Sequence, residues 1–237
     1  MPDRMETAVH ALTQGLQTAL GGRLVSLVLY GSVARGTHVP GRSDVNVLLI
    51  LSDASAATLG AASPSLRAWT KAGYPPPLIH TPAEWAASAD VYPLEVEDIR
   101  EAHRVLAGTD PVEGLLTRRE DQARELEHQV RGLLLHLRGH YAAAAADGRA
   151  LAALLTASIG IVLVFCRGAL RLADRSLPGD PGAVIGAAAA LAGFDPAPLT
   201  WALAARREGK TGLSAHDPIG AGYLAAVEQL VSFVNAR

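Results

Sequence analysis

The sequence predicts an α/β domain with a short mixed sheet, followed by an all-α helical bundle. In the first half of the 237 residues, short β-branched runs alternate with helical patterns and with the Gly and Pro residues that interrupt them. Beyond residue 115 the strand patterns end, and long segments rich in Ala, Leu and Arg carry apolar residues at helical spacing. We therefore expect two domains, at residues 1–115 and 116–237.

The composition excludes several classes of protein. Apolar residues make up 49% of the chain and charged residues 19%, so the chain folds around a core and is not disordered. The 21 Lys and Arg residues against 23 Asp and Glu residues give a net charge of -2. This balance offers no global electrostatic reason to bind nucleic acid or an anionic membrane. We expect neither partner, whereas an oligomer is compatible with the sequence.

The cysteine content and the apolar stretches predict a cytoplasmic location. Cys166 is the single cysteine and cannot form an intrachain disulfide, which favours a reducing compartment. The first 20 residues carry charges and no uninterrupted apolar segment, unlike a signal peptide. The longest uncharged apolar stretch, residues 150–166, is shorter than the roughly 18 residues that suggest a membrane span. It predicts a buried helix instead.

The first strands are predicted by apolar and β-branched runs. Apolar residues at helical spacing first predict a helix over residues 6–20. The run LVSLVLY at 24–30 is nearly all apolar, as in a central strand that is buried on both faces. The run DVNVLLIL at 44–51 predicts a second strand, in which Asp44 and Asn46 share a face.

Proline residues and a helix cap organise the next segment. Residues 52–72 favour a helix that is interrupted near Pro64. The three prolines at 75–77 force an extended chain, which leads into a third strand at 78–80. Thr81-Pro82-Ala83-Glu84 is typical of a helix start, with the threonine as N-cap and the glutamate three residues later.

A further strand is predicted shortly before the domain boundary. The run YPLEVEDI at 92–99 alternates apolar and polar residues, which is typical of a strand. Such a strand would present Glu95 and Glu97 on one face.

The second half shows helical patterns throughout. Residues 149–173 are apolar nearly all round, so this segment should be the central helix of the bundle. Asp147-Gly148 separates it from the preceding helix. The expected helices lie at residues 118–146, 149–173, 183–192, 196–208 and 218–235.

The segment from Leu27 to Leu51 contains the residues that predict a functional site. It reads as a strand, a Gly31-Ser32 turn, a short helix at 33–37, a loop, and a strand that begins at Asp44. Such a turn presents backbone N–H groups and a hydroxyl to a phosphate oxygen. The neighbouring strand can hold a divalent cation against the same phosphate. Together the two parts predict a metal-nucleotide site, as the transfer of a nucleotidyl group requires.

This pattern resembles the DNA polymerase β-like nucleotidyltransferase superfamily. The family signature is an apolar strand, Gly-Ser or Gly-Gly, about a dozen residues, and then Asp, apolar, Asp or Glu, apolar. Here Gly31-Ser32 is followed by eleven residues and then by Asp44-Val45-Asn46-Val47. The sequence is most similar to small bacterial members that modify antibiotics or proteins and join a nucleotidyltransferase-like domain to a C-terminal helical bundle.

The resemblance implies a function and a cofactor. Such a protein would transfer a nucleoside monophosphate from ATP or another nucleoside triphosphate to a hydroxyl of a small molecule or protein, with Mg²⁺. Gly31 and Ser32 would contact the phosphates. Arg35 and Arg42 are near enough in sequence to pair with phosphates as well.

The metal ligands and the general base follow from the same resemblance. Asp44 would bind the metal, and a third carboxylate would serve as a metal ligand or as a base toward the acceptor hydroxyl. Glu95 is our candidate because its neighbours in sequence are apolar, with Glu97 and Asp98 as alternatives.

Asn46 departs from the family pattern because it occupies the place of the second acidic ligand. An amide oxygen can coordinate Mg²⁺, but it carries no charge and cannot bridge two cations. Metal affinity and transition-state stabilisation should therefore fall. Two hypotheses follow: a weak or one-metal enzyme, or a catalytically impaired relative that acts as a nucleotide-binding or protein-interaction module.

Overall fold

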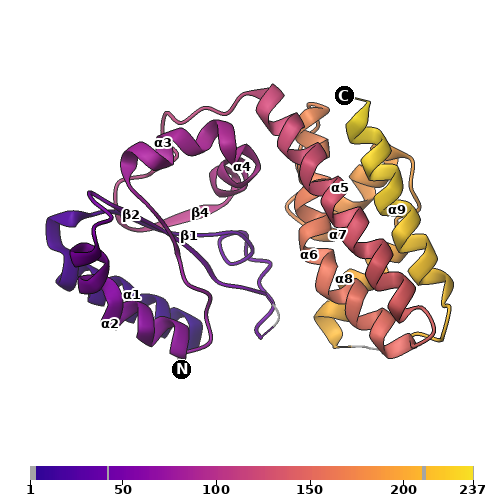
Figure 1. Ribbon diagram of the computed structural model, residues 1–237, viewed down its shortest axis with the longest axis horizontal. Helices are drawn as coiled ribbons and strands as arrows, with labels where there is room; N and C mark the ends of the chain where they lie inside the picture. Colours follow the sequence, from indigo (N-terminus) through magenta and orange to yellow (C-terminus); the bar gives the residue numbers. More distant parts are fainter. Residues whose placement is uncertain (1–3, 42, 210–211, 237) are drawn as a thin grey trace. The chain divides into compact units, whose positions relative to one another are not determined.

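The computed structural model describes residues 4–41, 43–209 and 212–236. The chain divides into two compact units, Met1–Thr117 and Arg118–Arg237 (Figure 1). The first unit combines a sheet with helices, and the described part of the second unit is helical. This architecture confirms the predicted fold class.

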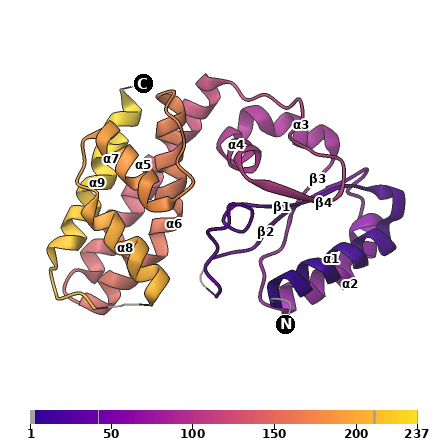
Figure 2. The same cartoon turned by 180° about the vertical axis from the view of Figure 1, so that it is seen from behind.

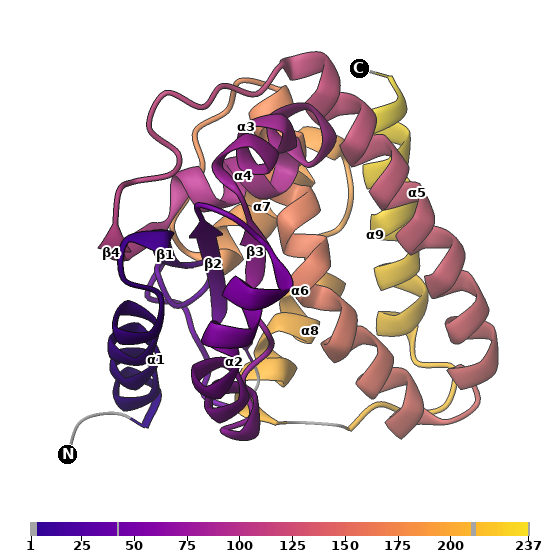
Figure 3. The same cartoon turned by 60° about the vertical axis from the view of Figure 1, so that its left-hand side comes forward.

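The first unit is built on a four-stranded mixed sheet with the strand order β3-β2-β1-β4 (Figure 3). β1 pairs antiparallel with both β2 and β4, whereas β2 and β3 run parallel. The sheet is therefore mixed, as predicted. The strands are β1 (Leu24–Tyr30), β2 (Asn46–Leu51), β3 (Leu78–His80) and β4 (His103–Gly108).

Helices cover both faces of this sheet (Figures 1 and 2). α1 and α2 lie on one face, and α3 and α4 lie on the other. A 3-10 turn, η1 (Gly21–Arg23), joins α1 to β1. The helices are α1 (Arg4–Leu20), α2 (Ala56–Lys71), α3 (Pro82–Val91) and α4 (Pro93–Glu101).

Strand alternation divides the core of the first unit into two clusters, because successive side chains point to opposite faces of a sheet. On the α1 and α2 side, β2 contributes Val47, Leu49 and Leu51. On the α3 and α4 side, it contributes Leu48 and Ile50. Asn46 has the same parity as this second set, so its side chain belongs to the face covered by α3 and α4.

The capping motif predicted at Thr81 is present at the start of α3. The Thr81 hydroxyl accepts a hydrogen bond from the Glu84 N–H (3.3 Å), and the Glu84 carboxylate accepts one from the Thr81 N–H (2.7 Å). Both groups satisfy backbone donors that the first helical turn leaves unpaired. The two bonds fix where the chain leaves β3 and enters α3.

The strand predicted at residues 92–99 is wrong, because this segment forms α4. Pro93, at the first helical position, needs no hydrogen-bond partner for its nitrogen and has the backbone angle of a helix. The buried residues Pro93, Val96 and Ile99 recur every three positions, which fits a helix face. The fourth strand is β4, which lies at a sheet edge and pairs with β1.

The second unit contains α6 packed against each of the other helices. Its core position agrees with the prediction from its apolar sequence. Among the described residues, α6 is the one helix long and apolar enough to cross a membrane, but the core helix of a folded unit passes the same test. The helices are α5 (Arg119–Ala144), α6 (Gly148–Leu172), α7 (Pro181–Ala192), α8 (Ala197–Glu208) and α9 (Pro218–Asn235).

Candidate functional site

A glycine is required where β1 ends and the chain turns. Gly31 has φ = +77°, in the left-handed region that side chains other than glycine rarely adopt. A Cβ atom at this position would also lie 3.0 Å from Nδ2 of Asn46. The turn and the start of β2 therefore lie close together.

The segment after Gly31 is a compact turn and not the short helix predicted at 33–37. The Arg35 N–H donates to the Gly31 carbonyl (3.0 Å), and the Thr37 N–H donates to the Ser32 carbonyl (2.9 Å). Gly36 then has φ = +70°. A left-handed residue ends a helical turn, so the helix does not continue.

The turn leaves a set of backbone donors without partners. The Gly31 N–H donates to the carbonyl of Ala102, just after α4 (3.3 Å), and so is already engaged. The amides of Ser32, Val33 and Ala34 donate to no group in the part of the chain that the structure describes. Consecutive backbone N–H groups of this kind are suited to an anion.

Asn46, Tyr30 and Glu95 gather on one face of the sheet. Asn46 is the register partner of Tyr30 across the β1–β2 ladder, so the two side chains lie next to each other on the same face. The Tyr30 hydroxyl donates a hydrogen bond to Oε1 of Glu95 on α4 (3.0 Å). Although Glu95 comes from a helix and not from the predicted strand, it lies over the end of β1.

The surroundings of Glu95 make its carboxyl a weaker acid than that of an ordinary glutamate. Burial raises the pKa of the Glu95 carboxyl, and the negative charge of Asp98 acts in the same direction, whereas the Tyr30 hydrogen bond and His80 oppose them. Burial and the nearby Glu95 also raise the pKa of Tyr30, which therefore stays a hydrogen-bond donor. A carboxyl whose pKa is raised is more readily protonated than an ordinary glutamate.

Asp44 lies at the surface, two residues before β2 begins. Val45, between Asp44 and Asn46, is buried in the core formed with α1 and α2. The Asp44 carboxylate lines a cavity of about 400 Å³, together with His38 and Tyr74. This carboxylate is therefore accessible to a cation.

β3, the strand that runs parallel to β2, contains no acidic residue. Leu48 of β2 pairs with Leu78 of β3. Continuing this parallel register back by two residues would place Pro76 beside Asn46. Across the described ranges, no group of three His, Cys, Asp or Glu side chains is arranged to hold a metal.

Asp44 and Asn46 offer one carboxylate and one neutral amide as oxygen donors. The cavity that Asp44 lines also includes Arg4 and Met5 of α1, and neither Asn46 nor Glu95 is among its lining residues. Mg²⁺ is often bound by one or two protein oxygens, with water and substrate phosphates completing its shell. One carboxylate and one amide do not fit a pair of bridged cations, which needs shared carboxylates.

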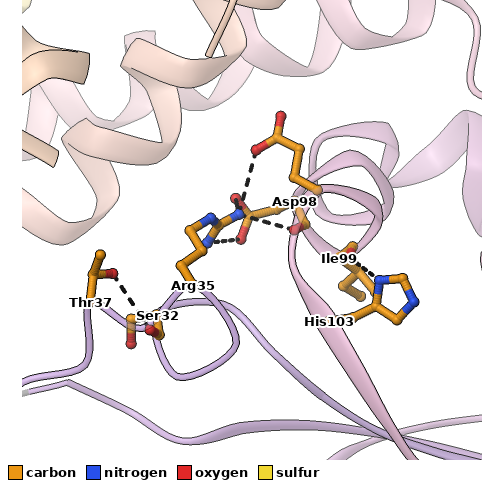
Figure 4. Close-up of polar contacts among 7 residues, drawn as sticks. Ser32, Arg35, Thr37, Asp98, Ile99 and His103 are labelled. Carbon is orange, nitrogen blue, oxygen red and sulfur yellow. Dashed lines mark hydrogen bonds and ion pairs between the residues drawn. The ribbon is translucent and has the colours of Figure 1, made fainter. Parts of the chain in front are cut away.

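Arg35 is directed at α4 and forms ion pairs there (Figure 4). Its guanidinium contacts both carboxylate oxygens of Asp98, at 2.6 and 3.3 Å, and donates to the Asp98 carbonyl at 3.0 Å. Glu101 lies 3.5 Å away. Arg42, the other arginine that the sequence singled out, lies outside the described residues.

The alternative carboxylates have other contacts. Glu97 accepts hydrogen bonds from Arg100 (3.2 Å) and from the Thr117 hydroxyl (2.6 Å). Asp98 pairs with Arg35. Of the three acidic residues considered on this segment, Glu95 is the one bonded to Tyr30.

Sequence reasoning missed Tyr30 as part of this constellation. Its position as the last strand residue before the Gly-Ser turn was visible, and antiparallel pairing of the two strands would have placed it beside Asn46. Glu95 was the candidate carboxylate, but strand pairing could not predict its contact with Tyr30, because Glu95 lies on α4 and not on the expected strand.

Comparison with known proteins gives a likeness of fold. No protein-family model matches the sequence, and no curated protein is similar to it. Among solved structures, the chain is similar to spectinomycin adenyltransferase AAD(9) from Enterococcus faecialis, crystallised with ATP and spectinomycin. The two are 14% identical with a TM-score of 0.60, and the likeness covers 95% of this chain and 98% of that one. It therefore extends through both units.

Proposed function

We propose that this protein binds a nucleoside triphosphate with Mg²⁺ and transfers the nucleoside monophosphate to a hydroxyl of a small molecule or protein. The close approach of Asn46 to Gly31 is the observation that carries the proposal, because the amides of residues 32–34, which donate to no described group, then lie beside the start of β2. The fold shared with an adenyltransferase along nearly the whole chain supports it. ATP is accordingly the first nucleotide to test.

The turn and Asp44 would divide the binding of the triphosphate between them. The amides of residues 32–34 and the Ser32 hydroxyl would hold phosphate oxygens. Asp44 would hold the Mg²⁺, with the Asn46 amide oxygen as a neutral second ligand. When bound, the cation would supply positive charge against the triphosphate.

Glu95 would act as the general base. During transfer, the acceptor oxygen bonds to the α-phosphorus while the bond to the pyrophosphate oxygen breaks, and the hydroxyl proton must go to a base. A raised pKa brings a carboxylate closer to the basicity that this step needs. The hydrogen bond from Tyr30 would keep the Glu95 carboxylate oriented.

Asn46 favours a second function, in which the protein binds a nucleotide or a partner but does not catalyse transfer. Asn46 stands where the family pattern has a second acidic residue, so the site carries one negative charge fewer. Such a protein would bind the nucleotide, or a protein partner, without transferring the nucleotidyl group. Losing a charge that stabilises the transition state commonly slows a reaction by orders of magnitude.

The two functions are separated by titrating Mg²⁺ and ATP by calorimetry and by following α-labelled ATP for transfer to candidate hydroxyl acceptors. The variants are Asp44→Asn and Asn46→Asp, with Asp90→Asn as an exposed carboxylate control on α3. Metal-dependent binding that Asp44→Asn abolishes and Asp90→Asn retains supports the site. Transfer by the natural protein supports the enzyme, whereas transfer by Asn46→Asp alone supports the impaired relative. If neither the natural protein nor Asn46→Asp binds ATP in a metal-dependent way, the proposal is overturned.

A further inference from the structure

We propose that Arg35 is a positioning residue whose ion pair with Asp98 fastens the Gly31-Ser32 turn to α4, the helix that carries Glu95. This assignment differs from the role of phosphate ligand that the sequence suggested for Arg35. The consequence for nucleotide binding rests on the proposed function, whereas the fastening of the turn can be tested without any nucleotide.

The contacts of Arg35 are numerous and shielded from water. The side chains of Arg35 and Asp98 are only 11% and 14% exposed. The guanidinium meets the two carboxylate oxygens in the forked arrangement that arginine is built to make, and it also donates to the Asp98 carbonyl. A pair this shielded cannot lose one partner without leaving the other charge poorly solvated.

A second link joins the same two segments. The Gly31 N–H donates to the carbonyl of Ala102, which follows the last residue of α4. The turn is thus tied near the C-terminal end of α4 through its first residue and also through Arg35, four residues later. The amides of residues 32–34, which donate to no group among the described residues, lie between these two points of attachment.

Helix geometry connects this link to the candidate base. Asp98 follows Glu95 by three residues, and residues three apart lie on the same face of a helix. One face of α4 therefore holds the turn through Asp98 and reaches Tyr30 through Glu95. Breaking the link to Asp98 would release the turn from the helix that sets the position of the carboxylate.

The charges around Arg35 argue against direct binding of a phosphate. Two carboxylates, from Asp98 and Glu101, lie within 3.5 Å of the guanidinium. A phosphate that recruited Arg35 would have to break this pairing and expose the incoming anion to both negative charges. The amides of residues 32–34 are not engaged in such an ion pair, so a phosphate could bind them without breaking one.

The first test is hydrogen exchange of the segment 31–37 in the protein without nucleotide. The variants are Arg35→Gln and the nearly isosteric Asp98→Asn, and the control is Arg104→Gln, which removes an exposed ion pair with Glu6 from the same unit. We expect exchange in this segment to become at least about tenfold faster in both variants and to stay unchanged in the control. Unchanged exchange in Asp98→Asn overturns the proposal.

The second test compares nucleotide affinity among the same variants and Arg35→Lys, by calorimetry with Mg²⁺ and ATP. A positioning role predicts that Arg35→Gln and Asp98→Asn weaken binding by similar factors, that the double variant is no weaker than either, and that Arg35→Lys restores part of the affinity. If Asp98→Asn binds as tightly as the natural protein while Arg35→Gln does not bind, Arg35 is a phosphate ligand and the proposal fails. Should the natural protein bind no ATP, the exchange result still decides whether the turn is fastened.

Discussion

Tyr30 and Glu95, 65 positions apart in the sequence, are joined by a hydrogen bond of 3.0 Å from the phenol to the carboxylate. This bond connects the end of β1 to α4 on the face of the sheet where Asn46 also lies. The Glu95 carboxyl is thereby held at the end of β1, in surroundings that raise its pKa chiefly by burial.

Replacing Glu95 by Gln should change how stability depends on pH. Because the pKa of Glu95 is raised in the folded protein, the folded state binds the proton more tightly than the unfolded state does. The natural protein should therefore gain stability relative to Glu95→Gln as the pH falls through the folded pKa, and lose it as the pH rises. Urea unfolding of both proteins at pH 5 and pH 8 would measure the difference. An equal difference at both pH values would contradict the raised pKa.

Replacing Gly31 by Ala should destabilise the first unit by about 1–3 kcal/mol. The alanine would have to adopt φ = +77° and bring its Cβ to 3.0 Å from the Asn46 amide. Gly22→Ala is the matched control, because a Cβ there meets nothing within 4 Å and φ is not positive. Chemical denaturation of the two variants gives the comparison, and a similar loss in both would be inconsistent with strain at the turn.

The cap of α3 gives a prediction independent of the candidate site. Thr81→Ala removes the oxygen that accepts from the Glu84 N–H, and should lower the free energy of unfolding by about 0.5–2 kcal/mol. The same cap predicts a pH dependence at Glu84, because the hydrogen bond from the Thr81 N–H lowers the pKa of the Glu84 carboxyl.

The stability that Glu84 contributes is therefore present above its unfolded pKa and lost as the pH falls through the folded pKa. Unfolding curves of Glu84→Gln should converge with those of the natural protein in acid, and a constant offset would exclude the bond.

The reactivity of the Cys166 thiol gives a test of how the second unit is packed. Burial in α6 raises the pKa of its thiol to about 12, so almost no thiolate is present at neutral pH. Iodoacetamide should leave the native protein unmodified at pH 7.5 and alkylate it fully in concentrated urea. Mass spectrometry would show both results. Rapid alkylation of the native protein would mean that α6 is not the core helix.

Long helices could be predicted from the sequence because their periodicity repeats over many turns. The helices predicted at 118–146 and 149–173 correspond to α5 and α6 within a few residues at each end. Short elements were harder, since eight residues at 92–99 fit strand alternation and helix spacing about equally well. β4 was missed because an edge strand with several exposed residues carries little apolar pattern.

The amino-acid order by itself determined the long helices, the strands β1 and β2 and the turn that follows β1, since all of these depend on patterns among neighbouring residues. Only the tertiary structure decided that Arg35 faces Asp98, 63 positions away, and that the carboxylate over Tyr30 comes from a helix. Contacts of this kind depend on how α4 packs on the sheet, and packing between distant segments leaves no local periodicity in the sequence.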